Sequence, residues 1–209
     1  MSGLDTRNKV IELSIKLFNQ NGIQNVRLQQ IADNAQISVG NLAYHFHDKG
    51  QIVKRIDRMI TEEMEKLIEC WNRMPGFMDF DNHLNRTYYL LDKYSFYFLD
   101  ILEIKRLYPE VHENQQKHIF SFIDRLRSWL EGSVIKGLLI KVDQPGQYQK
   151  VAEMIWFICS FWMSKKKILD QQEFHEGAFK EMIWQQLKPF FTEAGTSEFE
   201  IIIYPGLVT

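Results

Sequence analysis

The stretch RLQQIADNAQISVGNLAYHFHDK, residues 27–49, decides the fold of this chain. Its apolar residues recur at steps of three and four, and this spacing predicts one short helix over about 27–34 and a second over about 39–44. Ser38 is suited to begin the second helix, because its hydroxyl can accept a backbone N–H. Two short helices joined by a tight turn, the second with few large apolar groups, fit a unit whose second helix enters the major groove of DNA.

The residues inside this unit divide into a packing set and an exposed set. We expect four apolar residues to lock the two helices together: Ile31, Ala32, Ile37 and Leu42. Gly40 is small enough to let the second helix approach the DNA backbone closely, and the polar Asn41 and His45 can then reach bases or phosphates.

The rest of the chain carries the same helical spacing, so we predict an all-α protein. A first helix over about 6–21 ends at Gly22, and a long fourth helix starts after Asp48 and continues to about residue 73. Later helices are expected at 80–107 with a break inside, 110–139, 147–168 and 173–192, and Pro75-Gly76 is expected to be a bend. The tail at 198–204 contains three consecutive isoleucines and is expected to be a strand or extended arm.

This pattern predicts two domains. Residues 1–50 form an N-terminal three-helix domain with the helix-turn-helix motif at about 27–46, and residues 51–209 form a larger helical domain.

Charge is unevenly divided along the chain. The net charge is -2, yet residues 1–58 hold eight Lys and Arg against five Asp and Glu, which leaves a net negative charge on residues 59–209. Positive charge is therefore enriched in the segment that would meet phosphates.

Several classes of protein are disfavoured by the composition. The longest nearly apolar run, residues 154–163, is too short for a membrane span of about 20 residues, and the N-terminus lacks a secretory signal, so we expect a cytoplasmic protein without a membrane partner. Cys70 and Cys159 are expected to be core residues, and His45 and His47 are two apart, so neither a disulfide nor a metal site is predicted. No catalytic constellation or phosphate-binding loop stands out, so we expect neither an enzyme nor a cofactor.

The order of residues in the decisive stretch resembles a known family. I-A-x-x-A-x-I-S-x-G-x-L at 31–42, followed by Y-H-F-x-x-K at 44–49, is similar to the signature of the TetR/AcrR transcriptional regulators, and about 45 residues follow the family pattern. The resemblance implies a homodimeric, ligand-responsive repressor. It would bind a palindromic double-stranded DNA operator and leave it when a small-molecule effector enters the C-terminal helical domain.

The resemblance also implies which residues contact DNA. The positions are Gln29, Gln30, Ser38, Val39, Gly40, Asn41, Tyr44, His45 and Lys49. We assign Asn41, His45 and Gln29 to base edges, because amides and imidazoles both donate and accept hydrogen bonds. Tyr44, Ser38 and Lys49 are assigned to phosphates.

Three positions depart from the family pattern. Ala43 stands where Tyr is common, and Tyr44 replaces it only if the helix is slightly rotated. Gln36 stands where Gly is common, which costs about 1 kcal/mol if the backbone there is left-handed. Arg27 stands where a Ser or Thr cap is common, a change that removes about 1 kcal/mol of capping but adds a cation that can contact phosphate. These departures bear on operator affinity more than on the fold.

The larger domain is rich in aromatic residues. As the resemblance implies an effector cavity there, we expect a largely apolar or aromatic effector lined by Tyr94, Tyr97, Phe98, Phe122, Trp156, Phe157 and Phe161. The last two long helices are expected to pair with those of a second copy through Ile155, Cys159, Trp162, Phe179, Met182, Ile183 and Leu187.

Two alternatives to a DNA-binding regulator stay open. The two short helices can be a structural hairpin without DNA contact. The chain can also be a helical ligand-binding or scaffolding protein that kept the fold and lost its operator, and Ala43 and the small positive charge favour this alternative.

Overall fold

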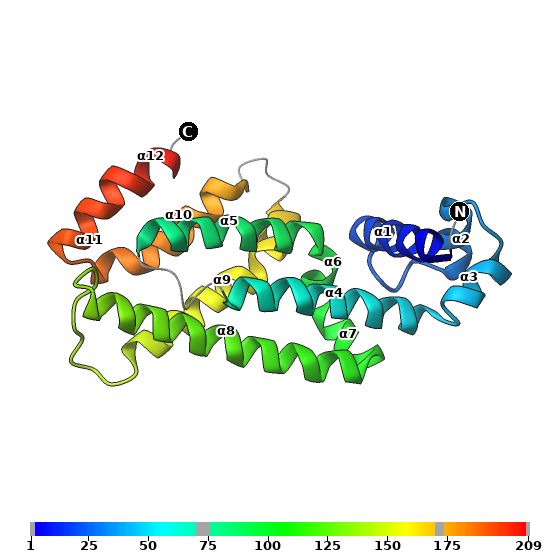
Figure 1. Ribbon diagram of the computed structural model, residues 1–209, viewed down its shortest axis with the longest axis horizontal. Helices are drawn as coiled ribbons and strands as arrows, with labels where there is room; N and C mark the ends of the chain where they lie inside the picture. Colours follow the sequence, from blue (N-terminus) through cyan, green and yellow to red (C-terminus); the bar gives the residue numbers. More distant parts are fainter. Residues whose placement is uncertain (1–2, 70–75, 170–173, 208–209) are drawn as a thin grey trace. The chain divides into compact units, whose positions relative to one another are not determined.

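The computed structural model describes residues 3–69, 76–169 and 174–207, which form helices joined by turns and loops (Figure 1). These residues contain no strand, and a single isolated bridge joins Leu139 to Phe191. The all-α prediction is therefore confirmed. None of the helices in these ranges is long and apolar enough to cross a bilayer. Pro75, where a bend was expected, lies outside the described residues.

The chain forms two compact units, each with more contacts inside it than to the other. The first comprises residues 1–63 and 93–115, and the second comprises residues 64–92 and 116–209. Two long helices, α4 (Lys49–Glu69) and α8 (Pro109–Ile135), contribute residues to both units.

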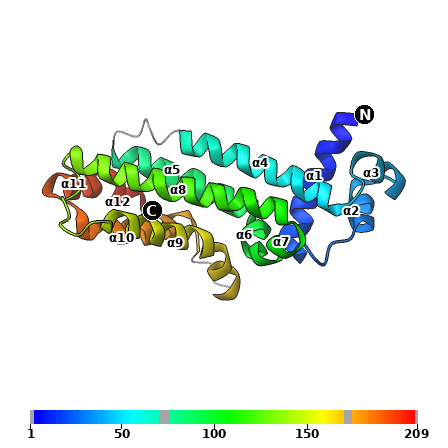
Figure 2. The ribbon, with the colours of Figure 1, turned by 90° about the horizontal axis from the view of Figure 1, so that it is seen from below.

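The first unit is built around three N-terminal helices. These are α1 (Gly3–Asn21), α2 (Leu28–Ala35) and α3 (Val39–His45), which lie together in both views (Figures 1 and 2). The unit also contains the start of α4, α6 (Ser95–Leu99), α7 (Ile101–Leu107) and the start of α8. α1 packs on α2 and α6, with the Phe18 and Phe96 ring centroids 5.1 Å apart, and α2 packs on α3.

The ends of the N-terminal helices follow local chemistry. Gly22 has a φ of 77°, the left-handed conformation that ends α1 as expected. The carboxylate of Asp48 accepts a hydrogen bond from the backbone N–H of Gln51 at 2.9 Å, which satisfies one of the free donors at the start of α4.

The second unit is a helical body with an aromatic core. It contains the rest of α4 and α8, together with α5 (Phe77–Lys93), α9 (Gln147–Leu169), α10 (Glu176–Leu187), a 3-10 turn (Lys188–Phe190), α11 (Glu193–Glu198), a π-helical turn (Phe199–Ile203) and α12 (Tyr204–Leu207). α9 packs on α10, and α10 on α12 (Figure 2). Phe80 stacks on Trp129 with centroids 4.2 Å apart and meets Trp184 edge-on at 5.3 Å.

The strand expected at 198–204 is wrong, because residues 193–207 are helical throughout. Phe199 and Ile203, four positions apart, are both buried, and the Phe199 ring lies 5.4 Å from Trp184. Ile201 and Ile202 between them are exposed, so the burial follows a helix face and not strand alternation. This packing overrides the β preference of the isoleucines.

Gly195 at this helical tail offers a test of the packing. A Cβ added there would collide with the backbone carbonyl oxygen of Leu138, so we expect Gly195→Ala to lower the free energy of unfolding by about 2 kcal/mol. Gly132→Ala in α8 is the control, because a Cβ there meets nothing within 4 Å, and it should raise stability by up to about 1 kcal/mol. Urea denaturation measures both variants, and equal stability of the two would refute the packing of the tail.

Candidate nucleic-acid interface

The helix α3 is capped as its sequence predicts. The Ser38 hydroxyl accepts a hydrogen bond from the backbone N–H of Asn41 at 3.1 Å, and Ser38 has extended backbone angles. On the inner side, Leu42 and the following Phe46 are buried in the core of the first unit. The cap and these two anchors fix the orientation of a helix too short to be stable alone.

The start of α2 is held in a way that sequence reasoning missed. Arg27 precedes the helix with an extended backbone, and its N–H donates to the side-chain oxygen of Gln30 at 2.7 Å. Gln30 thus accepts a hydrogen bond at the start of a helix that has no Ser or Thr cap. The sequence feature that predicts this bond is a Gln three residues after the capping position. Gln29 donates from its amide to Asp33 at 2.7 Å. The Arg27 and Gln29 side chains both lie on the exposed side of this unit.

The turn between α2 and α3 has the left-handed backbone that was considered for Gln36. Its φ is 58° and its ψ is 42°, and no other non-glycine residue of the described ranges has a positive φ. The N–H groups of Gln36 and Ile37 donate to Asp33 and Ala32 carbonyls, each at 3.1 Å, so the turn completes the end of α2. Gln36 therefore carries the strain that Gly would avoid.

The outer face of α3 is polar and open. Asn41 and Tyr44 are exposed, with Tyr44 86% accessible, and His45 is half-buried with its ring 5.3 Å from that of Tyr44. Val39 and Gly40 are exposed at the head of the helix, where only the Ser38 hydroxyl lies within 4 Å of a Cβ built on Gly40. Apart from Lys49, the expected contact residues thus belong to the α2–α3 unit.

Lys49 is engaged differently from the phosphate contact that was expected. Its ammonium donates to the backbone carbonyls of Ile23 at 2.8 Å and Val26 at 3.0 Å, and burial lowers its pKa. These bonds hold the loop between α1 and α2. The N–H of Ile23 donates in turn to the Asp100 carboxylate at 2.8 Å, at the junction of α6 and α7. We call this arrangement of Lys49, Asp100 and the loop 22–26 the loop clamp.

The residues expected to line an effector cavity are distributed over both units. Tyr94 and Tyr97 are buried and Phe98 is half-buried in the first unit. In the second unit, Phe122 and Trp156 are half-buried, whereas Phe157 and Phe161 are exposed on α9, at 49% and 55%. The exposure of these two rings favours a contact surface over a cavity lining.

Six of the seven residues expected at a dimer interface lie inside the chain. Ile155, Cys159, Trp162, Phe179, Ile183 and Leu187 are buried, and Met182 alone is exposed. The reason is that α9 packs on α10 within one chain, for example through Trp162 and Phe179, whose rings are 5.3 Å apart. Within the single chain these six side chains are covered by the chain's own helices, and their part in a dimer interface stays a prediction.

The described residues contain no cluster of metal-ligating side chains and no reactive cysteine. Burial raises the pKa of the Cys159 thiol to about 12, so this cysteine is an unreactive core residue as expected, and Cys70 lies outside the described residues. Across residues 3–69, 76–169 and 174–207, no three His, Cys, Asp or Glu side chains gather as metal ligands would.

Family models match nearly the whole of this architecture. Residues 10–56 match the model described as bacterial regulatory proteins of the tetR family, and residues 60–199 match the TetR model described as bacterial transcriptional repressor. The chain belongs to the TetR family. Its helix-turn-helix is the DNA-binding element of a transcriptional regulator, as the resemblance implied.

Individual TetR-family proteins show how far the likeness extends. The "Probable HTH-type transcriptional regulator YttP" of Bacillus subtilis (strain 168) is 30% identical over 66 residues, and this match spans about a third of each chain, 32%. A TetR-family regulator from Marinobacter aquaeolei VT8 has a similar fold, with a TM-score of 0.77 and 22% identity over 93% of both chains. The SmeT–triclosan complex superimposes with a TM-score of 0.63 and 15% identity over 91% of this chain and 94% of SmeT.

The left-handed turn of the TetR-family motif can be relieved by one substitution. We expect Gln36→Gly to raise the free energy of unfolding by about 1 kcal/mol, because glycine adopts this conformation without strain. The same exchange at Gln185, which is exposed within α10, should lower stability by about 1 kcal/mol. Chemical denaturation compares the two, and a loss of stability at position 36 would show that the turn carries no strain.

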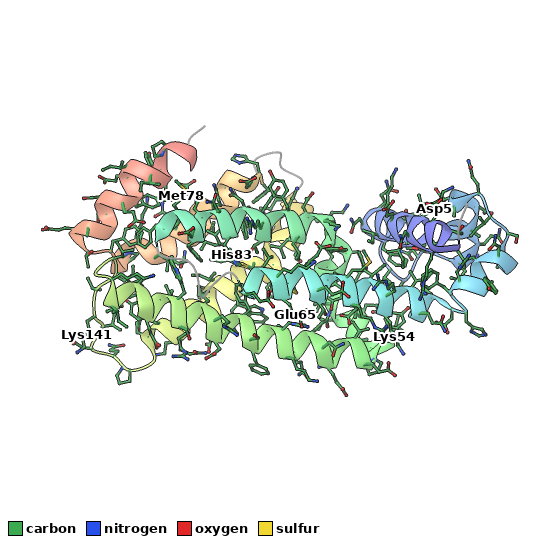
Figure 3. The ribbon with its side chains drawn as sticks, viewed as in Figure 1. Asp5, Lys54, Glu65, Met78, His83 and Lys141 are labelled. Carbon is green, nitrogen blue, oxygen red and sulfur yellow. The ribbon has the colours of Figure 1, made fainter. Side chains whose placement is uncertain are left out.

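Substitution of Lys49 tests whether this lysine holds the loop clamp or contacts a DNA phosphate. Lys49→Met should lower the free energy of unfolding by about 2 kcal/mol and weaken DNA binding, while leaving the slope of log K against log salt unchanged. Lys54→Met is the control, because Lys54 is exposed on the same helix (Figure 3), and its stability should change by less than about 0.5 kcal/mol. If Lys49→Met instead reduced the salt slope by about one and kept full stability, Lys49 would be a phosphate contact.

Proposed function

We propose that this TetR-family chain is a ligand-responsive repressor, which binds a palindromic operator as a homodimer and leaves it when a small effector binds. The observation that carries the proposal is the exposed polar face of α3, with Asn41 and Tyr44 on the outside and Leu42 anchored on the inside. Amide and phenol groups on the exposed side of a short, rigidly held helix suit contact with a major groove.

Each exposed residue of the motif has a proposed task. Asn41, His45 and Gln29 contact base edges, where side chains that both donate and accept can distinguish base pairs. Ser38 and Tyr44 contact phosphates, together with the exposed Arg27. Gln30, Val39 and Gly40 shape the surface between them. Lys49 acts through the loop clamp and positions the unit.

The proposed dimer uses the exposed face of α9. Met154, Phe157 and Phe161 follow one another at steps of three and four, all exposed, and the rings of the two phenylalanines stack with centroids 6.1 Å apart. Met182 on α10 is also exposed. One recognition helix reads too few base pairs, so two copies about 34 Å apart are needed to read successive grooves.

The proposed effector binds the larger helical domain, residues 51–209, while residues 1–50 contact DNA. The aromatic content of this domain suits a largely apolar or aromatic molecule, and the similar fold of SmeT was solved with triclosan. Effector binding would favour a dimer geometry whose recognition helices no longer match successive grooves. A cytoplasmic location follows from this function.

A second candidate function is a helical ligand-binding protein that has lost operator binding. Ala43, at a position where the family commonly has Tyr, and the strained Gln36 favour it. Anisotropy of a labelled duplex from upstream of the gene separates the two candidates, because only the repressor binds with an affinity that exceeds that for unrelated DNA.

Removing the base-reading side chains tests the assignment. Asn41→Ala with His45→Ala should weaken binding to the upstream duplex by about a hundredfold or more, since each lost base contact costs roughly 1–3 kcal/mol. The mass and thermal midpoint of the protein should not change, because neither side chain is part of the core. Asn82→Ala, an exposed asparagine in α5, is the control. Undiminished binding by the double variant would refute the assignment.

Charges on the α9 face test the dimer. Phe157→Asp with Phe161→Asp should weaken dimerisation by about a hundredfold or more, because two apolar anchors become carboxylates in a buried contact. Phe120→Asp, on α8 and also exposed, should leave the dimer intact. Sedimentation velocity reports the mass of each variant, and a doubly substituted protein that stays dimeric would exclude this face.

A further inference from the structure

A buried polar cluster joins three helices of the first unit. Asp57 on α4 is 2% exposed, and its carboxylate accepts hydrogen bonds from the Tyr97 hydroxyl at 2.6 Å and the Asn114 amide at 3.2 Å. Tyr97 lies on α6, and Asn114 lies on α8 next to Gln115, which is 5% exposed. We call these four residues the Asp57 cluster.

The cluster is not saturated with hydrogen bonds. Both side-chain polar atoms of Gln115 are buried and make no well-formed hydrogen bond, although this amide lies close enough to the Tyr97 hydroxyl to influence it. A buried amide left unpaired costs about 1–3 kcal/mol. Such a group is retained more readily where a bound molecule can satisfy it.

The described hydrogen-bond partners of Asp57 are neutral groups. Over the described residues, no Lys, Arg or His forms an ion pair with Asp57, and the nearby Lys54 and Arg55 pair with Glu110 and Glu62 instead. Burial, and then the charge of Asp57, raise the pKa of Tyr97, so the phenol stays protonated. The groups that remain free to accept a hydrogen bond are the Asp57 carboxylate and the Gln115 carbonyl.

Asn114 is the exposed member of the cluster, and its bond to Asp57 is at the long end of the range for hydrogen bonds. A stronger donor arriving from solvent can therefore replace it at little cost. An ammonium group is such a donor, because a charge-assisted bond to a carboxylate is about twice as strong as a neutral one.

Asp57 and Tyr97, which share the shortest hydrogen bond of the cluster, lie on the same elements as the residues of the loop clamp. Asp57 and Lys49 lie on α4 eight residues apart, about 12 Å along the helix. Tyr97 lies three residues before Asp100. A molecule that binds Asp57 and changes its contact with Tyr97 thus acts on the two helices that carry Lys49 and lead to Asp100.

We propose that the Asp57 cluster is a binding site for the amine head of a cationic, apolar effector, with Asp57 pairing with the ammonium and Gln115 accepting a second hydrogen bond. This inference rests on the proposed function and names the chemical class of its effector. Displacement of Asn114, with an ammonium charge placed beside the bond between Asp57 and Tyr97, changes how α4 and α6 hold the loop clamp, and this change reduces operator affinity.

Three probes that share one ring system test the site on the full chain. Calorimetric titration is carried out with 1-naphthylmethylamine, 1-naphthalenemethanol and 1-naphthoate. The amine should bind at least about tenfold more tightly than the alcohol and the acid. Asp57→Asn should remove this preference. Glu65→Gln, which removes one charge from an exposed position of the same helix (Figure 3), should retain it.

A second variant decides the case if Asp57→Asn does not fold. Gln115→Met removes the unpaired amide at nearly constant volume, so it should raise the thermal midpoint and weaken amine binding several-fold. The proposal is overturned if the amine binds no better than the other two probes. It is also overturned if every folded variant of the cluster binds the amine as the unmodified protein does.

The titration contains no DNA, so it is independent of the proposed function. Anisotropy with the upstream duplex is measured separately, with and without the amine. If the chain binds the amine but no DNA, the proposed amine site is supported and the proposed repressor function is contradicted. If the chain binds DNA but not the amine, the proposed repressor function is supported and the proposed amine site is contradicted.

Discussion

The burial of Leu42 and Phe46 beneath α3 is the interaction on which the rest of the interface depends. A helix of seven residues is not stable alone, and its orientation comes from these two anchors and the Ser38 cap. Each buried side chain contributes roughly 1.5–3 kcal/mol. Because the apolar side of α3 is fixed inward, Asn41 and Tyr44 on the other side are presented to solvent. The exposed polar face of this helix is thus a consequence of core packing.

A second layer of contacts extends this rigidity to the neighbouring helices. The loop clamp satisfies one N–H and three carbonyls of the segment between α1 and α2, using a lysine from α4 and an aspartate from the α6–α7 junction. The backbone N–H and carbonyl groups of this loop are therefore satisfied by two charged side chains that are far from it in the sequence. The Asp57 cluster joins the same helices farther along α4. In the proposed site, a molecule that loosens one of these supports changes the other.

Much of the N-terminal interface was predictable, because its signals are local. Gly22, Ser38 and Gln36 each act within one turn of backbone, and spacing alone identifies α1 to α3. The loop clamp was not predictable, since it joins Lys49 and Asp100 to a loop far away in the sequence. The faces of α9 could not be assigned either: this helix is apolar on both sides, so periodicity does not say which side meets α10 and which is exposed. In the tail, the propensity of three isoleucines was outweighed by the burial of Phe199 and Ile203.

Hydroxyl-radical footprinting of the full chain on its own upstream DNA tests the central claim most directly. Two copies of α3, each presenting its polar face, are expected to protect two segments on one side of the duplex, about one helical turn or 34 Å apart. Protection should persist at salt concentrations that abolish binding to unrelated DNA. Absence of protection, or protection spread evenly along the duplex, would contradict the claim that α3 reads an operator.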